Sequence, residues 1–157
     1  MKIIFTTAIL LGVFSLAVGR RLPRNLYQFS TLIELITGRD AWDYNNYGCW
    51  CGSGGAGMPV DQIDMCCYFH DGCYDDLIAN GWSPHYVTYD WTQYDIGIGC
   101  DDPAGTSDRG ACECDLAAAH CFSYFPYPNA TGKPACPEDS TLPGCLDSNP
   151  SLCIATG

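Results

Sequence analysis

The sequence predicts a mainly α, disulfide-rich fold built on two long antiparallel helices. Cys66 and Cys73 are separated by the same seven residues as Cys114 and Cys121. Seven residues correspond to about two helical turns, so each pair places two sulfur atoms on one side of its own helix. The chain holds 12 cysteines, an even number that is typical of a secreted disulfide framework.

The beginning of the chain has the pattern of a secretory signal peptide. Lys2 precedes an apolar run over residues 3–16 and a small-x-small ending at residues 17–19. The apolar run is too short to span a bilayer comfortably. We therefore expect a signal peptide at 1–19, a short propeptide at 20–24 that contains three arginines, and one domain at 25–157.

An amphipathic N-terminal helix is expected next, because apolar residues recur at helical spacing. They precede a stop at Gly38 and comprise Leu26, Phe29, Leu32, Ile33 and Ile36. Ordinary core packing is one interpretation of this apolar face.

A glycine-rich loop at residues 47–57 carries two cysteines one residue apart. Cys67 can tether this loop through Cys51, and the backbone carbonyls of the loop would then face Asp71. Carbonyls plus a carboxylate form a set of hard oxygen ligands, which suits Ca²⁺ better than zinc. The alternative is a flexible turn, but cysteines at both Cys49 and Cys51 favour a fixed loop.

The longer helix is expected to start after Pro59 and to end near residues 80–81. If it runs antiparallel to its partner, Cys66 can meet Cys121 and Cys73 can meet Cys114. The same geometry places His70, Asp71 and Asp115 on one face, with Asp115 offset from His70 by about 3 Å along the axis. A His–Asp couple is one interpretation of this face, and a solvated pair is the other.

Later segments are simpler. Val87, Tyr89 and Trp91 alternate with polar residues, which predicts strand character before a small hairpin near residues 90–100. After Phe122 the chain is rich in Pro, Gly, Asn and Ser, which indicates an extended, bridged tail.

Three motifs resemble those of the secreted phospholipases A2. Residues 47–57 match the family's calcium loop throughout, residues 61–74 match its active-site helix, and residues 112–122 correspond to its second helix. Residues 25–29 are similar to the start of mature enzymes in the elapid and pancreatic group. The resemblance covers the chain from about residue 25 to residue 122. It also implies a second interpretation of the apolar face of the N-terminal helix, part of which would line the acyl channel and meet the membrane.

The resemblance implies a role for each matching residue. The implied calcium ligands are the carbonyls of Trp50, Gly52 and Gly54 and the carboxylate of Asp71. The implied catalytic residues are His70 as general base, Asp115 as its orienting partner, Tyr74 and Tyr89 as hydrogen-bond donors to that aspartate, and the N–H of Gly52 as an oxyanion donor. The implied reaction is calcium-dependent hydrolysis of the sn-2 acyl ester of a glycerophospholipid, which yields a free fatty acid and a lysophospholipid.

The resemblance also implies four disulfides: Cys51–Cys67, Cys66–Cys121, Cys73–Cys114 and Cys100–Cys112. It leaves Cys49 to reach into the tail, where Cys136, Cys145 and Cys153 compete for it. The two that remain are expected to bridge each other.

Charge limits the partners. The chain has 7 basic and 18 acidic residues, and removal of Lys2 and the three arginines at 20–24 leaves 3 − 18 = −15. Nucleic acid is therefore not expected as a ligand. We expect the partner to be a phospholipid membrane or micelle, with zwitterionic lipid preferred. We also expect a monomer. Trp42 is either an interfacial anchor or a buried core residue. Asn129 begins a glycosylation sequon.

Two other classes of function remain open. The scaffold could serve as a phospholipase-like toxin subunit or a receptor or channel ligand without turnover. Acidity and cysteine bridges are also compatible with a calcium-binding extracellular matrix protein. The sequence does not distinguish a role in venom, digestion or signalling.

Overall fold

The structure is a computed structural model that describes residues 24–128 and 132–137. In this part of the chain it contains three α-helices, two short 3₁₀ helices and one two-stranded antiparallel hairpin. The α-helices are α1 (Arg24–Thr37), α2 (Gln62–Ala79) and α3 (Ser107–Tyr124). The 3₁₀ helices are η1 (Ala41–Asp43) and η2 (Pro84–Tyr86), and the strands are β1 (Trp91–Tyr94) and β2 (Gly97–Cys100). The predicted mainly α, disulfide-rich fold class is confirmed.

Helix α1 has the predicted amphipathic character. Leu32 and Ile33 are buried in the core, whereas Leu26 remains 46% exposed. The helix ends at Gly38, whose N–H donates to the carbonyl of Glu34 at 3.0 Å and whose φ of 67° is the left-handed conformation that glycine adopts readily after a helix.

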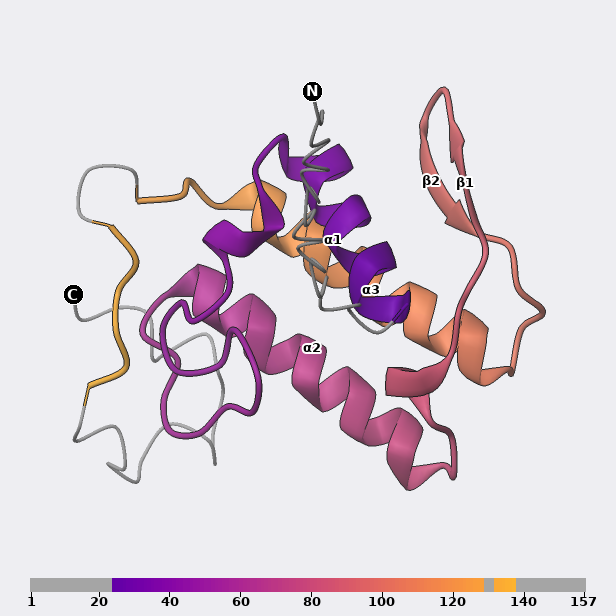
Figure 1. The fold of residues 1–157 in the computed structure, drawn as a ribbon, viewed down its shortest axis with the longest axis horizontal. Helices are drawn as coiled ribbons and strands as arrows, with labels where there is room; N and C mark the ends of the chain where they lie inside the picture. Colours follow the sequence, from indigo (N-terminus) through magenta and orange to yellow (C-terminus); the bar gives the residue numbers. More distant parts are fainter. Residues whose placement is uncertain (1–23, 129–131, 138–157) are drawn as a thin grey trace, which may run out of the picture.

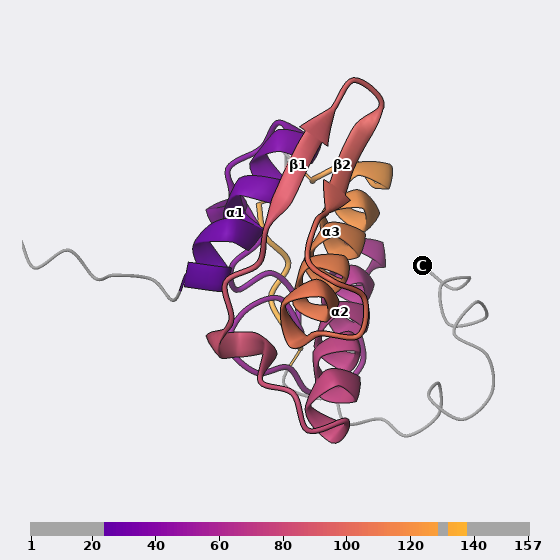
Figure 2. The same ribbon diagram turned by 90° about the vertical axis from the view of Figure 1, so that its right-hand side faces the viewer.

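Helices α2 and α3 are joined by the two predicted rungs, Cys66–Cys121 and Cys73–Cys114. Each helix begins with a side-chain cap: Asp61 accepts from the N–H of Asp64 in α2, and Thr106 accepts from the N–H of Arg109 in α3. Helix α3 packs against both α1 and α2 and lies between them (Figure 2). Its inward face carries small residues that allow close approach, together with one aromatic ring: Ala111, Ala118, Ala119 and Phe122.

Three further disulfides tie the loops to this helical core. Cys51–Cys67 and Cys100–Cys112 form as the resemblance implies. Cys49 pairs with Cys136, which answers the question of its partner in the tail. Every described cysteine is bridged. Several predicted features lie outside the described residues: the signal peptide, residues 20–23 of the propeptide, the sequon at Asn129, and Cys145 and Cys153.

The hairpin is confirmed, with Trp91 opposite Cys100 and Tyr94 opposite Gly97, and it projects from the helical body (Figures 1 and 2). Strand character for residues 87–90 is wrong, because β1 begins only at Trp91. The backbone of Tyr89 is bonded instead to the side chain of Gln28 on α1, which accepts from its N–H at 3.2 Å and donates to its carbonyl. An extended segment held by a side chain in this way can have the same alternation of apolar and polar residues as a strand.

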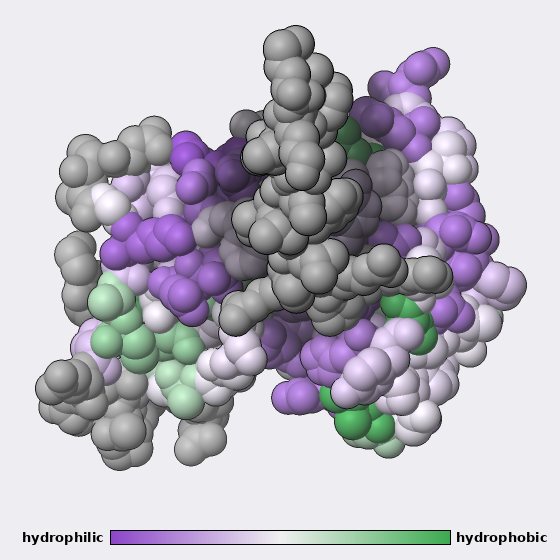
Figure 3. Space-filling model, viewed as in Figure 1, coloured by the Kyte–Doolittle hydropathy of each residue, from purple (hydrophilic) through white to green (hydrophobic). Residues whose placement is uncertain are grey.

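On the face that Figure 3 shows, the coloured residues are mainly hydrophilic, and the hydrophobic ones form small, separate patches. Trp42 is 56% exposed, so the alternative of a buried core tryptophan is wrong. Among the described helices, none has the length and apolar character that a membrane crossing requires.

Candidate active site

His70 and Asp115 are in direct contact, which is the first of the two interpretations of their shared helical face. Nε2 of His70 lies 2.7 Å from Oδ1 of Asp115 and, because a carboxylate can only accept, this nitrogen carries the shared proton. The His70 side chain is 14% exposed and the Asp115 side chain is fully buried. One rung of the disulfide ladder lies on each side of His70 along α2, so the contact is built on two covalently joined helices.

Two tyrosines complete the hydrogen bonding of Asp115. The hydroxyl of Tyr74 donates to Oδ1 at 2.9 Å, and the hydroxyl of Tyr89 donates to Oδ2 at 2.6 Å. Burial raises the pKa of both phenols, and the charge of Asp115 raises it further. Both tyrosines therefore remain neutral donors at physiological pH, and both carboxylate oxygens are paired.

The other nitrogen of His70 points away from this network. Nδ1 lies 3.8 Å from Oδ1 of Asp71, and the ring of Phe29 stacks on the imidazole at a centroid distance of 4.6 Å. Burial lowers the pKa of His70, but Asp115 and Asp71 raise it more, so that it reaches about 9. Asp71 is thus both a neighbour of the imidazole and a source of its basicity.

A cavity of about 740 Å³ connects His70 to the glycine-rich loop. The cavity brings together residues from α1, η1, the loop and α2. Its polar lining includes Asn45, Gly52, Ser53, Gly54, His70 and Asp71. Its apolar and aromatic lining includes Leu26, Phe29, Ile33, Trp42, Trp50 and Phe122. The apolar face of α1 therefore serves both predicted purposes, because Leu32 is core while Phe29 lines the cavity.

The fit of this site to a cation depends on backbone oxygens. No cluster of three His, Cys, Asp or Glu side chains in the described part of the chain could hold a metal ion. The carbonyls of Trp50, Gly52 and Gly54 accept no hydrogen bond from any described residue. The Asp71 carboxylate is 31% exposed and has His70 as its ion-pair neighbour. These three loop residues and Asp71 line the same cavity, and carbonyl and carboxylate oxygens are the ligands that Ca²⁺ prefers.

Asp64 is a functional candidate that the sequence did not single out. Its carboxylate is fully buried and accepts three backbone N–H bonds, from Cys49 and Trp50 at 2.7 Å and from Val60 at 2.9 Å. Cys49 and Trp50 lie near the start of the glycine-rich loop and Val60 lies three residues after its end, so one side chain on the first turn of α2 holds the backbone on both sides of the loop. The position of Asp64, three residues after the capping Asp61, was the only signal in the sequence for this role. That spacing does not show which backbone N–H groups the carboxylate contacts.

Two other contacts near the site were also not predicted. Asn25 is buried, and its amide donates to the carbonyl of Pro84 at 2.9 Å, which ties α1 to η2. His85 packs edge-on against the ring of Tyr74 at 4.9 Å and lines the cavity.

The comparison with known families agrees with this geometry. The family model described as phospholipase A2 matches residues 26–132, well over half of the chain. The matched range includes the His–Asp contact, both tyrosines and the glycine-rich loop.

Proposed function

This chain belongs to the phospholipase A2 family, which hydrolyses phospholipid esters, and from this premise we propose that it is a secreted, calcium-dependent enzyme that cleaves the sn-2 acyl ester of glycerophospholipids. The products are a free fatty acid and a lysophospholipid. The observation that carries the proposal is the orientation of His70, whose Nε2 is held by Asp115 at 2.7 Å while Nδ1 lies on the side of Asp71 and the cavity.

In this proposal His70 acts as general base. Nδ1 accepts a proton from a water molecule as the water oxygen bonds to the ester carbonyl carbon. The imidazolium then returns that proton to the leaving alkoxide as the acyl–oxygen bond breaks. Asp115 holds the tautomer and stabilises the imidazolium, in the orienting role that the carboxylate of a catalytic triad plays. The hydroxyls of Tyr74 and Tyr89 donate to Asp115 and hold it in place.

The glycine-rich loop supplies the remaining groups. The N–H of Gly52 would donate to the oxyanion that develops on the carbonyl oxygen. Ca²⁺ would be held by the carbonyls of Trp50, Gly52 and Gly54 and by Asp71. When bound, it supplies Lewis acidity and neutralises the phosphate of the substrate. A cation there would also offset the charge of Asp71, one of the two carboxylates beside His70.

The lipid partner follows from the lining of the cavity and the charge of the surface. Apolar side chains such as Leu26, Phe29 and Phe122 offer contact area for an acyl chain. The charge of −15 expected for residues 25–157 disfavours anionic membranes. We propose a monomer that acts on zwitterionic lipid, with Trp42 in contact with the lipid surface.

The test is fatty acid release by the purified chain that begins at residue 25. We expect release from phosphatidylcholine with calcium and none with chelator. Loss of turnover in His70→Gln, with unchanged circular dichroism and melting temperature, would assign the activity to this site. Location of the released acyl chain at sn-2 is read with a substrate that carries different acyl chains at its two positions.

Two outcomes would contradict the proposal. Calcium binding without any turnover would favour a ligand or toxin subunit that uses the scaffold alone. Turnover that persisted at the wild-type rate in His70→Gln would place the chemistry elsewhere.

A further inference from the structure

A short segment after α3 lies along the segment that precedes the glycine-rich loop. We call residues 132–136 the strap and residues 40–45 the tryptophan platform. The strap is attached near its end by the Cys49–Cys136 disulfide and by the N–H of Gly48, which donates to the carbonyl of Pro134 at 2.9 Å. Figure 1 shows the chain after α3 passing beside the loop that precedes α2.

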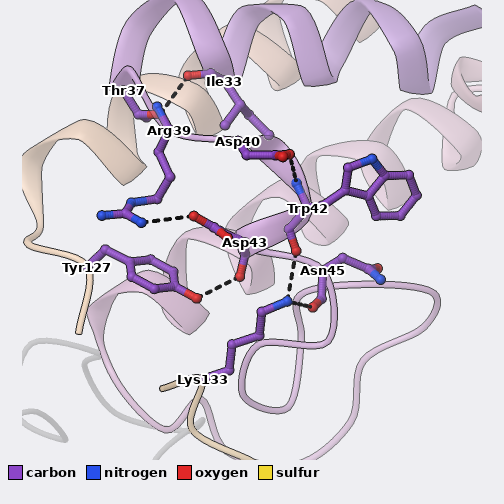
Figure 4. Close-up of polar contacts among 9 residues, drawn as sticks. All are labelled: Ile33, Thr37, Arg39, Asp40, Trp42, Asp43, Asn45, Tyr127 and Lys133. Carbon is purple, nitrogen blue, oxygen red and sulfur yellow. Dashed lines mark hydrogen bonds and ion pairs between the residues drawn. The ribbon is translucent and has the colours of Figure 1, made fainter. Parts of the chain in front are cut away.

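Lys133 links the strap to the tryptophan platform. Its ammonium donates to the carbonyl of Trp42 at 2.8 Å and to the carbonyl of Asn45 at 2.9 Å (Figure 4). Lys133 is only three residues from Cys136, so the disulfide limits the positions that the side chain can reach. A cation that donates to two backbone carbonyls is suited to holding a turn in one conformation.

The platform is fixed from two other directions. The carboxylate of Asp40 accepts from the N–H of Trp42 at 2.9 Å, and the hydroxyl of Tyr127 donates to the carbonyl of Asp43 at 2.8 Å. In Figure 4 the indole of Trp42 points away from Lys133 and Tyr127. The backbone of Trp42 is therefore held by several bonds, although its side chain is 56% exposed.

Trp42 lies at the border between the cavity and the surface. It lines the cavity together with Leu26, which is also partly exposed. An exposed indole suits the polar–apolar boundary of a lipid surface, where its ring contacts acyl chains and its N–H contacts the head groups.

The basic residues after Arg24 are few, and they bond within the molecule. After Arg24 the sequence has only three, Arg39, Arg109 and Lys133. Arg39 pairs with Asp43 at 2.8 Å, and Arg109 pairs with Glu113 at 2.6 Å and donates to the carbonyl of Asp102. Each of the three makes bonds inside the molecule. Exposed apolar and aromatic side chains such as Leu26 and Trp42, rather than a cationic patch, are therefore what the cavity border offers to a lipid surface.

We propose that Lys133 is a positioning residue that holds the tryptophan platform, so that Trp42 meets a zwitterionic lipid surface at the mouth of the cavity. The inference rests on the proposed function and deepens it. Lys133 contacts neither the substrate nor the reacting atoms. It acts on turnover at a lipid surface and leaves the chemical step unchanged.

The experiment compares Lys133→Met, Lys133→Arg and Arg109→Met. Arg109→Met removes the same charge, together with the bonds of Arg109 to Glu113 and Asp102 at the start of α3, and makes none of the contacts of the tryptophan platform, so it controls for the loss of one bonded cation elsewhere. Binding is measured with vesicles of non-hydrolysable ether-linked phosphatidylcholine. Turnover is measured separately on a short-chain phosphatidylcholine below its critical micelle concentration, where no lipid surface exists.

We expect Lys133→Met to weaken vesicle binding by about threefold, since an exposed ion–dipole contact is partly screened by water. Turnover of the monomeric substrate should stay at the wild-type rate. Lys133→Arg, which keeps donors that can reach the carbonyls, should retain most of the binding, and Arg109→Met should match wild type. In a Trp42→Ala background, Lys133→Met should have no further effect.

Three outcomes would overturn the inference. Equal binding by Lys133→Met and wild type would remove any role for the strap. Equal weakening by Arg109→Met would reduce the effect to net charge. A fall in monomeric turnover that parallels the fall in binding would indicate a structural role only. Absence of fatty acid release from phosphatidylcholine with calcium in the wild-type chain would instead contradict the proposed function.

Discussion

Gly48 lies against the buried carboxylate of Asp64, and a β-carbon at this glycine would come within 2.3 Å of the Asp64 carboxylate. The carboxylate cannot move aside without leaving the N–H groups of Cys49 and Trp50. Gly48 also has a φ of 61°, a left-handed conformation that side chains disfavour. The start of the glycine-rich loop is therefore restricted both by conformation and by space.

We predict that Gly48→Ala lowers the free energy of unfolding by about 1–3 kcal/mol, because backbone strain and the clash with Asp64 act together. Denaturant unfolding measures this change. The control is Gly81→Ala, which has a similar positive φ of 84° but open space around the new methyl group. Equal destabilisation by the two variants would show that the contact with Asp64 adds nothing to backbone strain.

Asp64→Asn should lower both the free energy of unfolding and the affinity of the glycine-rich loop for calcium. The amide can replace one accepting oxygen, but its NH₂ group would face backbone N–H donors. Loss of charge-assisted hydrogen bonds at a fully buried site should cost about 2–3 kcal/mol. We also expect weaker calcium binding by calorimetry, because both ends of the loop lose their anchor. Unchanged calcium affinity in a folded Asp64→Asn variant would contradict the anchoring role.

Helical geometry explains why much of the site could be predicted. The rotation and rise of a helix are nearly constant, so the spacing of Cys66 and Cys73 predicted that both sulfur atoms lie on one side of α2, where an antiparallel partner allows the two observed bridges. The same rotation placed His70 and Asp115 on one face, where a direct couple and a solvated pair were both possible. Residues on rigid elements of known handedness can be placed in this way without any knowledge of the loops.

Loops and long-range closures could not be predicted on the same basis. The orientation of Asp64 toward the backbone at 48–50 depends on the path of the loop, and no periodicity encodes that path. Three cysteines in the tail could equally reach Cys49, and Cys136 is its partner across a sequence separation of 87 residues. The contacts of Lys133 follow only from that closure.

The two tyrosines that bond Asp115 should not be equivalent. Tyr89 is the donor to Oδ2, whereas Tyr74 shares Oδ1 with His70. Tyr89→Phe therefore leaves one buried carboxylate oxygen without its donor, while Tyr74→Phe leaves both oxygens bonded. We expect Tyr89→Phe to lower the free energy of unfolding by about 1–3 kcal/mol, and Tyr74→Phe to lower it by less.

Denaturant unfolding of both single variants and of the double variant measures this difference. The double variant should be less stable than the sum of the single effects predicts, because Asp115 then loses both phenol donors. Equal and additive losses would mean that the two hydroxyls support Asp115 independently.

Calcium should stabilise the folded chain through Asp71. A ligand that binds only the native state at 100 times its dissociation constant adds about 2.7 kcal/mol to the free energy of unfolding. In a chain of this size we expect that gain to raise the melting temperature by about 5–10 °C. Asp71→Asn should lose most of this increase, because it removes the carboxylate of the proposed ligand set. Asp76→Asn, which neutralises an exposed aspartate on the same helix, should keep this increase.

Differential scanning calorimetry with calcium, with magnesium and with chelator measures the change in melting temperature. Magnesium should give a smaller increase because it demands a stricter octahedral geometry. A calcium shift of the same size in Asp71→Asn and Asp76→Asn would place the cation away from the glycine-rich loop.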